Sequence, residues 1–440
     1  MTESHSFDVW SFLRCILGVL VIIFIAYLLS TDRKAISWKL VFWGILAQIV
    51  LAMGVLYFPP LKFVFEFIGR LFILVLDFTK EGSRFIFGDL ADSQKIGFFF
   101  AFQVLPTIIF FSALTSLLFY WGIIQKIVFG FAWLLSRLLK LSGAESLVVV
   151  ANVFLGQSEA PLLVKPYLSK MTPSEIFMIM TAGMATLSGG VLAVYIGFLG
   201  GDDPVQRILF AKHLLSASIM AAPGAVVLAK IIFPQSEKVD VNVFVPTQVV
   251  GANTLEAVSN GTVDGLKLAA NIAAMLIVFI SFMAMFNYVI GWIGEWTHIN
   301  NWVFYVTHGK YNQLSLQLLL GYALAPLMWL IGVNVHDIDL IGRLLGEKIV
   351  LTEMIGYKSL AELKATGAFF DQQSIVIATY ILCGFANFAS IGIQLGGLGV
   401  LAPNQRVTIS KFGFVAMVAA TLASLLSATI VNLLMGLVKL

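Results

Sequence analysis

Two glutamates stand inside apolar stretches of the sequence, where a carboxylate is costly. Glu159 follows the run 147–155, in which only Asn152 is polar, and Glu353 follows Ile349-Val350-Leu351. A charge in apolar surroundings needs compensating partners. The plain alternative is that each glutamate lies in a surface loop. Otherwise each carboxylate is a binding group, which accepts strong hydrogen bonds from hydroxyl groups.

Short polar segments also interrupt two long apolar runs. The first is 184–191, Met-Ala-Thr-Leu-Ser-Gly-Gly-Val, and the second consists of 385–390 with Gly396 and Gly397 further along. Small residues in a membrane helix often mean close packing, which explains the glycines but not Asn387. Asn387 and Ser390 are three residues apart and therefore share one helical face. An amide and a hydroxyl there suit a neutral solute rich in hydroxyls, such as a sugar or a nucleoside.

The same segments offer oxygen ligands for a cation. Where a membrane helix unwinds, its free carbonyls can coordinate Na⁺. Asn152 and Thr186 would add side-chain oxygens to such carbonyls. The residues themselves thus indicate a coupled transporter of a polar organic solute, with a cation as the coupling ion.

The composition says what kind of chain must position these groups. Of 440 residues, 59% are hydrophobic and 12% charged, whereas soluble domains carry about 25% charged residues. We therefore expect a polytopic membrane protein. The net charge of +3 excludes a nucleic-acid binder that works by bulk charge. Two cysteines and five scattered histidines give no metal cluster or nucleophile–base pair, so we expect neither an enzyme nor an organic cofactor.

Apolar runs of about 20 residues predict membrane spans. We expect an all-α protein with eight of them, at 12–29, 40–58, 97–121, 176–200, 208–232, 266–292, 375–398 and 412–437. Charges along one face of 62–77 and of 121–141 predict helices lying at the membrane interface, as does the weakly polar 313–332. The alternative is that the first two span the membrane with their charges turned inward.

The stretches around the two glutamates are interrupted and do not fit ordinary spans. Each arm beside the polar tip is too short to cross the hydrocarbon alone. We therefore predict re-entrant hairpins at 147–168 and 340–362, whose irregular tips must face protein or a water-filled cavity.

Basic residues near the span ends predict the orientation. If four of the connecting loops are cytoplasmic, both termini lie outside the cell. These loops hold Arg33, Lys34, Lys39, Lys126, Arg137, Lys140, Lys165, Lys170, Lys230, Lys238, Lys267, Arg406 and Lys411. Four basic residues oppose the rule but lie among carboxylates: Arg343, Lys348, Lys358 and Lys364.

The order of these elements repeats along the chain. Span, amphipathic segment, hairpin and two spans occur in 97–262 and again in 263–440, after a peripheral segment 1–96. An odd number of crossings between the copies would invert the second. Inverted repeats with interrupted helices are typical of secondary transporters, whose site lies at the repeat interface.

Two motifs carry a family resemblance over most of the chain from Gly97 onward. Residues 156–163, Gly-Gln-Ser-Glu-Ala-Pro-Leu-Leu, and 383–392, Cys-Gly-Phe-Ala-Asn-Phe-Ala-Ser-Ile-Gly, resemble the signatures of the concentrative nucleoside transporters. The resemblance implies a homotrimer with eight spans and two hairpins, and an elevator-type movement. It also implies a plasma-membrane protein, here of the bacterial inner membrane, that takes up nucleosides such as uridine or adenosine.

The resemblance further implies site residues. Gln157, Ser158 and Glu159 would face the nucleobase, with Val191 packed against it, while Glu353, Asn387 and Ser390 would bind ribose beside Phe385. Asn152, Thr186 and the carbonyls of Leu155 and Leu187 would hold Na⁺. The sequence departs from the family at Thr352, where Asn is frequent, and at Met354, where Phe is frequent.

Other functions stay open at this point. Proton-coupled members share much of the signature, so H⁺ is the alternative coupling ion, although Asn152 with Thr186 favours Na⁺. A channel and a membrane-embedded enzyme are rivals of another class, and a channel would differ by conduction that does not saturate with solute.

Overall fold

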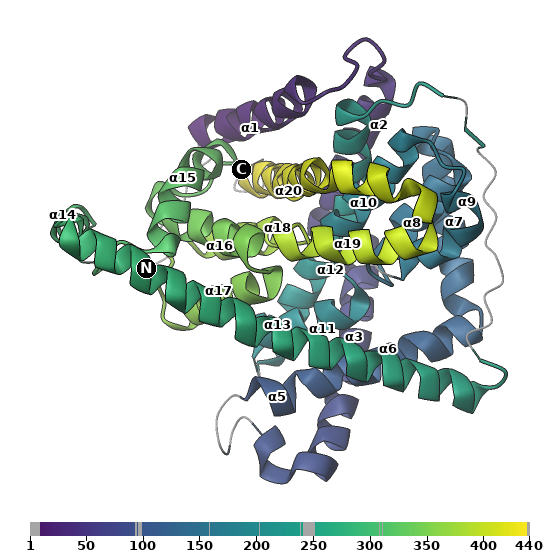
Figure 1. Cartoon of the computed structure of the whole chain (residues 1–440), viewed down its shortest axis with the longest axis horizontal. Coiled ribbons are helices and arrows are strands. Elements are labelled where there is room, and N and C mark those ends of the chain that lie inside the picture. The colour runs from purple at the N-terminus through teal and green to yellow at the C-terminus, as the bar shows by residue number, and fades with distance from the viewer. Residues whose placement is uncertain are drawn as a thin grey trace.

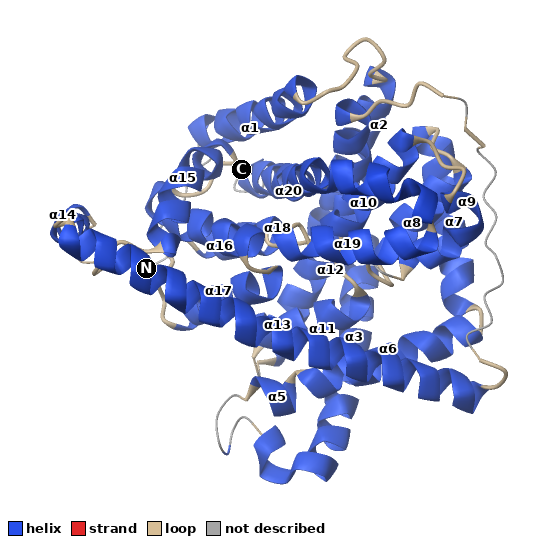
Figure 2. Cartoon of the chain, viewed as in Figure 1, coloured by secondary structure: helices blue, strands red, loops and turns tan. Residues whose placement is uncertain are grey.

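The computed structural model describes residues 9–92, 95, 99–157, 159–201, 203–237, 239–240, 251–307, 309 and 311–437. Every regular element within these residues is a helix, which confirms the all-α prediction (Figure 2). Ser158, one of the predicted nucleobase ligands, lies outside the described residues.

The N-terminal part consists of helices whose ends follow from local sequence. They are α1 (Val9–Leu28), α2 (Trp38–Tyr57), α3 (Pro59–Phe87), η1 (Gly88–Ala91), α5 (Phe100–Gln103), α6 (Leu105–Tyr120) and α7 (Ile123–Leu139). Pro59 and Pro60 open α3, since the first helical turn needs no N–H donor from its residues. Val104, which precedes Leu105-Pro106, separates α5 from α6 within the apolar run 97–121.

The first interrupted stretch starts four residues earlier than predicted. Helix α8 (Gly143–Asn152) begins at Ser142, which forms a capping box with Glu145. The chain then leaves helical geometry until η2 (Ala160–Val164) and α9 (Lys165–Leu168). The fourth predicted span is divided into α10 (Pro173–Ala185) and α11 (Gly189–Gly200), and α12 (Pro204–Ile232) follows unbroken.

The second half shows the same order of elements. Its helices are α13 (Thr254–Trp296), α14 (Ile299–Val306), α15 (Leu316–Leu330), η3 (Val335–Asp337), α16 (Ile338–Val350), α17 (Glu353–Ala365), α18 (Gln372–Ile381), α19 (Phe388–Leu401), η4 (Pro403–Gln405) and α20 (Arg406–Leu437). Only Leu351 and Thr352 separate α16 from α17, and α18 and α19 divide the seventh predicted span.

The two divided spans touch through their breaks. Gly384 lies in the break between α18 and α19 with φ +93°, a conformation that favours glycine. A β-carbon at this position would lie 2.4 Å from the carbonyl oxygen of Ala185, the last residue of α10. The absence of a side chain therefore lets the two backbones approach closely at the centre of the molecule.

Burial separates inner from outer helices. In the most apolar 18-residue stretch of α12, 94% is buried inside the protein, whereas the corresponding share in α1 is 22%. Helices α10, α12 and α20 pack together at the core, whereas the long α13 runs along one side and packs mainly on α6 (Figure 1). The breaks that carry the polar residues lie beside this buried core.

Several helices are suited to a bilayer, so the chain is a multi-pass membrane protein. Among the described residues, six helical segments are long and apolar enough to cross: Trp10–Leu28, Trp38–Tyr57, Phe100–Tyr120, Pro173–Gly200, Pro204–Ile232 and Pro403–Gly436. These correspond to six of the eight predicted spans. The full set of eight, the two re-entrant hairpins and the inverted orientation stay predictions.

Candidate functional site

Glu353 lies fully inside the protein at the first position of α17, 6% exposed. Its Oε1 accepts a hydrogen bond from the Tyr195 hydroxyl at 3.0 Å. Its Oε2 accepts one from Asn387 Nδ2 at 2.8 Å. The carboxylate is therefore held from two sides by α11 and by the start of α19. Because a carboxylate has about four acceptor positions, it can still accept hydrogen bonds from a ligand.

Asn387 is fixed by its place at the end of a helix. It is the N-cap of α19, and its Oδ1 accepts a hydrogen bond from the Ser390 backbone N–H at 2.9 Å. This capping bond turns Nδ2 toward Glu353 and prevents the amide from reversing. Asn387 thus orders both the helix start and the carboxylate.

Gln157 connects the tip of the first interrupted stretch to the same helix. Its Nε2 donates to Ser390 Oγ at 3.0 Å. Gln394, one turn further along α19, donates from Nε2 to Gln157 Oε1 at 3.2 Å and to the Met180 carbonyl at 3.0 Å. The structure therefore brings Gln157 of the first half together with Ser390, Asn387 and Glu353 of the second half in one buried hydrogen-bonded chain.

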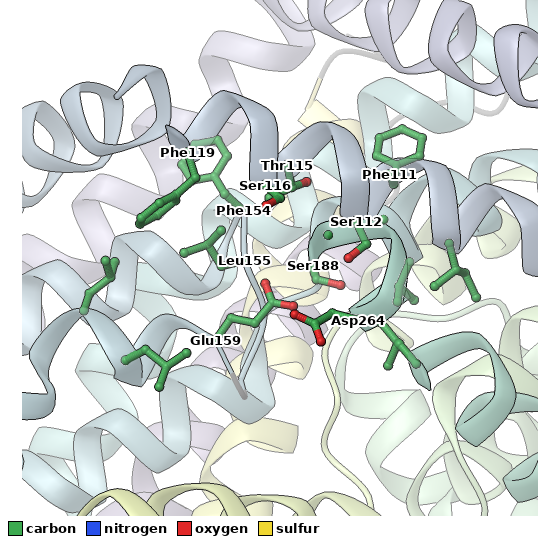
Figure 3. Close-up of a pocket in the computed structure, with 17 residues that line it drawn as sticks. Phe111, Ser112, Thr115, Ser116, Phe119, Phe154, Leu155, Glu159, Ser188 and Asp264 are labelled. Atoms are coloured by element: carbon green, nitrogen blue, oxygen red, sulfur yellow. The ribbon is translucent and has the colours of Figure 1, made fainter. Parts of the chain in front are cut away.

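Glu159 is placed apart from this chain. It is exposed and lines a cavity of about 210 Å³ between the first interrupted stretch, α6 and α13. Its carboxylate points toward that of Asp264 on α13 (Figure 3). Val191 and Leu155 line the same cavity. The predicted nucleobase residues are thus divided between the buried chain, which holds Gln157, and this cavity.

Phe385 lies in the break between α18 and α19 and is half-buried against the core. Its carbonyl accepts a hydrogen bond from the Asn387 backbone N–H at 2.9 Å. The ring is therefore carried by the same short segment as the carboxylate's partner.

The predicted sodium ligands lie around the break of the first divided span. Asn152, the last residue of α8, is fully buried, and neither atom of its amide finds a hydrogen-bond partner among the described residues. Such a group is costly unless something satisfies it. Thr186 donates its hydroxyl hydrogen to the Ala182 carbonyl at 2.9 Å, so its oxygen lone pairs stay free.

One backbone hydrogen bond brings these two segments together, and a side chain of α12 holds the break. The Gly189 N–H donates to the Phe154 carbonyl at 3.1 Å, and the Leu187 carbonyl accepts from Ser218 Oγ at 3.3 Å. The donor set contains amide, hydroxyl and carbonyl oxygens without a carboxylate, which suits a monovalent hard cation. The unsatisfied amide of Asn152 fits such an ion. Among the described residues, no cluster of His, Cys, Asp and Glu could hold a metal ion.

Three residues of the site were missed in the sequence. Gln394 shares a helical face with Asn387 and Ser390, and this spacing could have identified it. Tyr195 is one aromatic residue in an apolar helix and gave no signal. Lys348 was noted only as one of four basic residues that oppose the orientation rule, and it has no exposed surface at all.

Comparisons with known proteins agree over almost the whole chain. The model described as Na⁺ dependent nucleoside transporter C-terminus matches residues 213–432, and its N-terminal counterpart matches 17–90. A nucleoside recognition domain, called Gate, matches 101–202. These matches extend over both halves and most of segment 1–96.

Relatives and solved structures extend over the same length. An uncharacterized transporter of Haemophilus influenzae is 39% identical, over 97% of this chain and 99% of its own. Rat sodium/nucleoside cotransporter 1 is 37% identical over 95% of this chain, which spans 63% of the rat protein.

CNTnw in an inward-facing substrate-bound state superposes with a TM-score of 0.87 at 35% identity, covering 98% of this chain and 99% of CNTnw. A doubly substituted CNTnw in an outward-facing state gives 0.86 at 35% identity, covering 97% and 98%. With the family models, these matches show that the chain belongs to the Na⁺-dependent nucleoside transporters and is not an enzyme.

Proposed function

We propose that this chain carries nucleosides across the membrane together with Na⁺, by alternating access. The observation that carries the proposal is the buried chain from Gln157 to Glu353, which joins the two halves of the molecule through hydrogen bonds. A carboxylate at this depth is costly. It accepts from two internal donors and, with about four acceptor positions in all, could still accept from the hydroxyls of a ribose.

The polar groups divide by chemistry into two subsites. Glu353, Asn387 and Ser390 lie at the starts of α17 and α19 and would bind ribose, with Phe385 beside them. Gln157, Ser158 and Glu159 would face the nucleobase, with Val191 packed against its ring. Amide groups match the donor and acceptor edge of a base, and an apolar side chain matches its face.

Asn152, Thr186 and the carbonyls of Leu155 and Leu187 would hold the sodium ion. The support is the unsatisfied amide of Asn152 beside the unwound break of the first divided span. The ion would order the break, and Val191 lies in the first turn of α11 directly after it. Nucleoside and ion would then bind more tightly together than separately, and the linkage is reciprocal.

The larger arrangement follows the same proposal. Segment 1–96 would be peripheral, and 97–262 and 263–440 would be inverted repeats with hairpins at 147–168 and 340–362. The apolar side chains that α13 exposes, such as Phe282, Phe286 and Trp292, would meet neighbouring subunits of a homotrimer. Segment 1–96 would belong to the scaffold of the trimer, and the transport domain with the binding site would move past it as an elevator. The protein would lie in a bacterial inner membrane with both termini outside.

The test is uptake of radiolabelled uridine and adenosine into proteoliposomes, with Na⁺ and proton gradients imposed separately. We expect saturable uptake that requires the Na⁺ gradient. Uptake that follows only the proton gradient would assign H⁺ as the coupling ion. Uptake of neither nucleoside under any gradient would refute the substrate, and flux that does not saturate would indicate a channel.

A further inference from the structure

Lys348 is a lysine without any exposed surface near the centre of the molecule. Its ammonium donates to the carbonyls of Ile381 at 2.9 Å and Cys383 at 2.8 Å. The third hydrogen bond goes to Ser424 Oγ at 3.2 Å. The three N–H groups of an ammonium are therefore all used, and each partner is a neutral oxygen. Lys348 is thus coordinated as a cation by an oxygen shell rather than paired with a carboxylate.

The shell belongs to the break of the second divided span. Ile381 is the last residue of α18, and Cys383 lies in the unwound segment before α19. Carbonyls at a helix end have no intrahelical partner and carry partial negative charge. Ser424 of α20 adds a hydroxyl, which itself donates to the Cys383 carbonyl at 2.8 Å.

The first half contains the same arrangement without a lysine. In the divided span of the first half, α10 ends at Ala185, and the carbonyl of Leu187 lies in the unwound segment that follows. Ser218 of α12, the helix that follows this span, donates to the Leu187 carbonyl at 3.3 Å. Ser424 of α20, the helix that follows the second span, does the same for Cys383. The neighbouring arm, α8, here ends in Asn152, whose amide has no hydrogen-bond partner among the described residues.

We propose that Lys348 is a tethered cation, which permanently occupies in the second half the position that a free coupling ion takes in the first. The inference rests on the proposed sodium site. It gives the protein one exchangeable ion site per chain. Because the lysine also ties the break to α16, two residues before the end of that helix at Val350, it positions the ribose subsite without contacting the ligand.

Removing the lysine side chain should turn its shell into a second ion site. Lys348→Ala leaves two carbonyl oxygens and a hydroxyl oxygen around a vacated space. Carbonyl oxygens of unwound helices are ligands that Na⁺ takes in transporters, and the hydroxyl of Ser424 would add a third oxygen. The Hill coefficient of Na⁺ in uridine binding should rise from about one to about two. The ratio of radiolabelled sodium to uridine taken up by proteoliposomes should double.

Two further variants separate this role from a structural one. Lys348→Met removes the charge but fills the space, so we expect weak uridine binding that high Na⁺ does not restore. Lys364→Ala is the matched control. Lys364 also donates to a carbonyl, that of Leu199, at 2.7 Å, but it is partly buried on α17 away from the breaks. Its removal should leave the sodium-to-uridine ratio unchanged.

The outcomes distinguish the two proposals. Wild-type protein without sodium dependence would refute the proposed function, and this inference with it. A sodium-dependent wild type whose Lys348→Ala variant keeps a single-ion ratio would overturn the tethered cation alone. If Lys348→Ala unfolds in choline chloride, the inference expects recovery of the folded protein in sodium chloride. Equal unfolding in both salts would overturn it.

Discussion

Replacing Glu353 by glutamine isolates the charge of the proposed ribose subsite. The Asn387 amide cannot reverse, because its Oδ1 is held by the Ser390 N–H at 2.9 Å. The introduced amide must therefore offer its oxygen to Asn387 Nδ2 and its NH₂ group to Tyr195, whose hydroxyl can accept. Both internal contacts are kept, so the protein should fold normally. The loss falls on a ligand hydroxyl, which meets an NH₂ group in place of a carboxylate oxygen.

The size of the effect follows from one charge-assisted hydrogen bond. Such a bond contributes about 1.5–3 kcal/mol, and each 1.4 kcal/mol is a factor of roughly ten in affinity. We therefore expect the Kd of uridine to rise between roughly tenfold and a hundredfold in Glu353→Gln. The melting temperature should change little, because the volume and the two internal contacts remain.

Calorimetric titration of purified protein with uridine at saturating Na⁺ measures this directly. Glu347→Gln is the matched control on α16, since Glu347 is also buried but pairs with Arg343 at 2.8 Å. It should lower the melting temperature and leave the affinity unchanged. Wild-type affinity in Glu353→Gln, with the fold intact, would remove the carboxylate from the ribose subsite. Equal weakening in Glu347→Gln would show a nonspecific effect of losing a buried charge.

Three other variants test the remaining parts of the site. Glu159→Gln should weaken uridine binding by about tenfold, the loss of one charged acceptor, without changing the melting temperature, because the carboxylate is exposed in a cavity; unchanged affinity by calorimetry would place the nucleobase elsewhere. Asn152→Ala removes an amide that has no hydrogen-bond partner among the described residues, so we expect a higher Na⁺ concentration for half-maximal uptake together with unchanged or raised stability. A drop in stability with normal sodium dependence would contradict that role. Gly384→Ala should destabilise the protein by at least about 2 kcal/mol through its positive φ and its 2.4 Å approach to Ala185. Gly367→Ala, also at positive φ but with nothing within 4 Å of the added carbon, should cost clearly less in the same thermal unfolding assay.

Some interactions could be read from local sequence. Asn387 and Ser390 share a helical face at a spacing of three. In the structure, Asn387 is the N-cap of α19, and its side-chain oxygen accepts the N–H of Ser390. The interruption of two apolar runs by small and hydroxylic residues predicted breaks, which lie at 186–188 and 382–387. Such features depend only on neighbours along the chain, where periodicity and capping rules apply.

The contacts that complete the site join residues far apart in sequence. Tyr195 reaches Glu353 across 158 positions, and Gln157 reaches Ser390 across 233. A single sequence carries no signal for such pairs, because a tyrosine in an apolar helix looks the same whether it packs against lipid or donates to a carboxylate.

Hydropathy and helix breaking are local properties, so the order of residues was enough to predict an all-helical membrane chain with two costly glutamates beside broken helices. The partners of those glutamates depend on packing and became known from the fold. It separated Glu159, which faces Asp264 across a cavity, from the buried carboxylate of Glu353. It also turned Lys348 from one basic residue among several into a cation enclosed by carbonyls. The physical reason is that burial and coordination depend on how helices pack, and packing brings together oxygens that the chain order keeps apart.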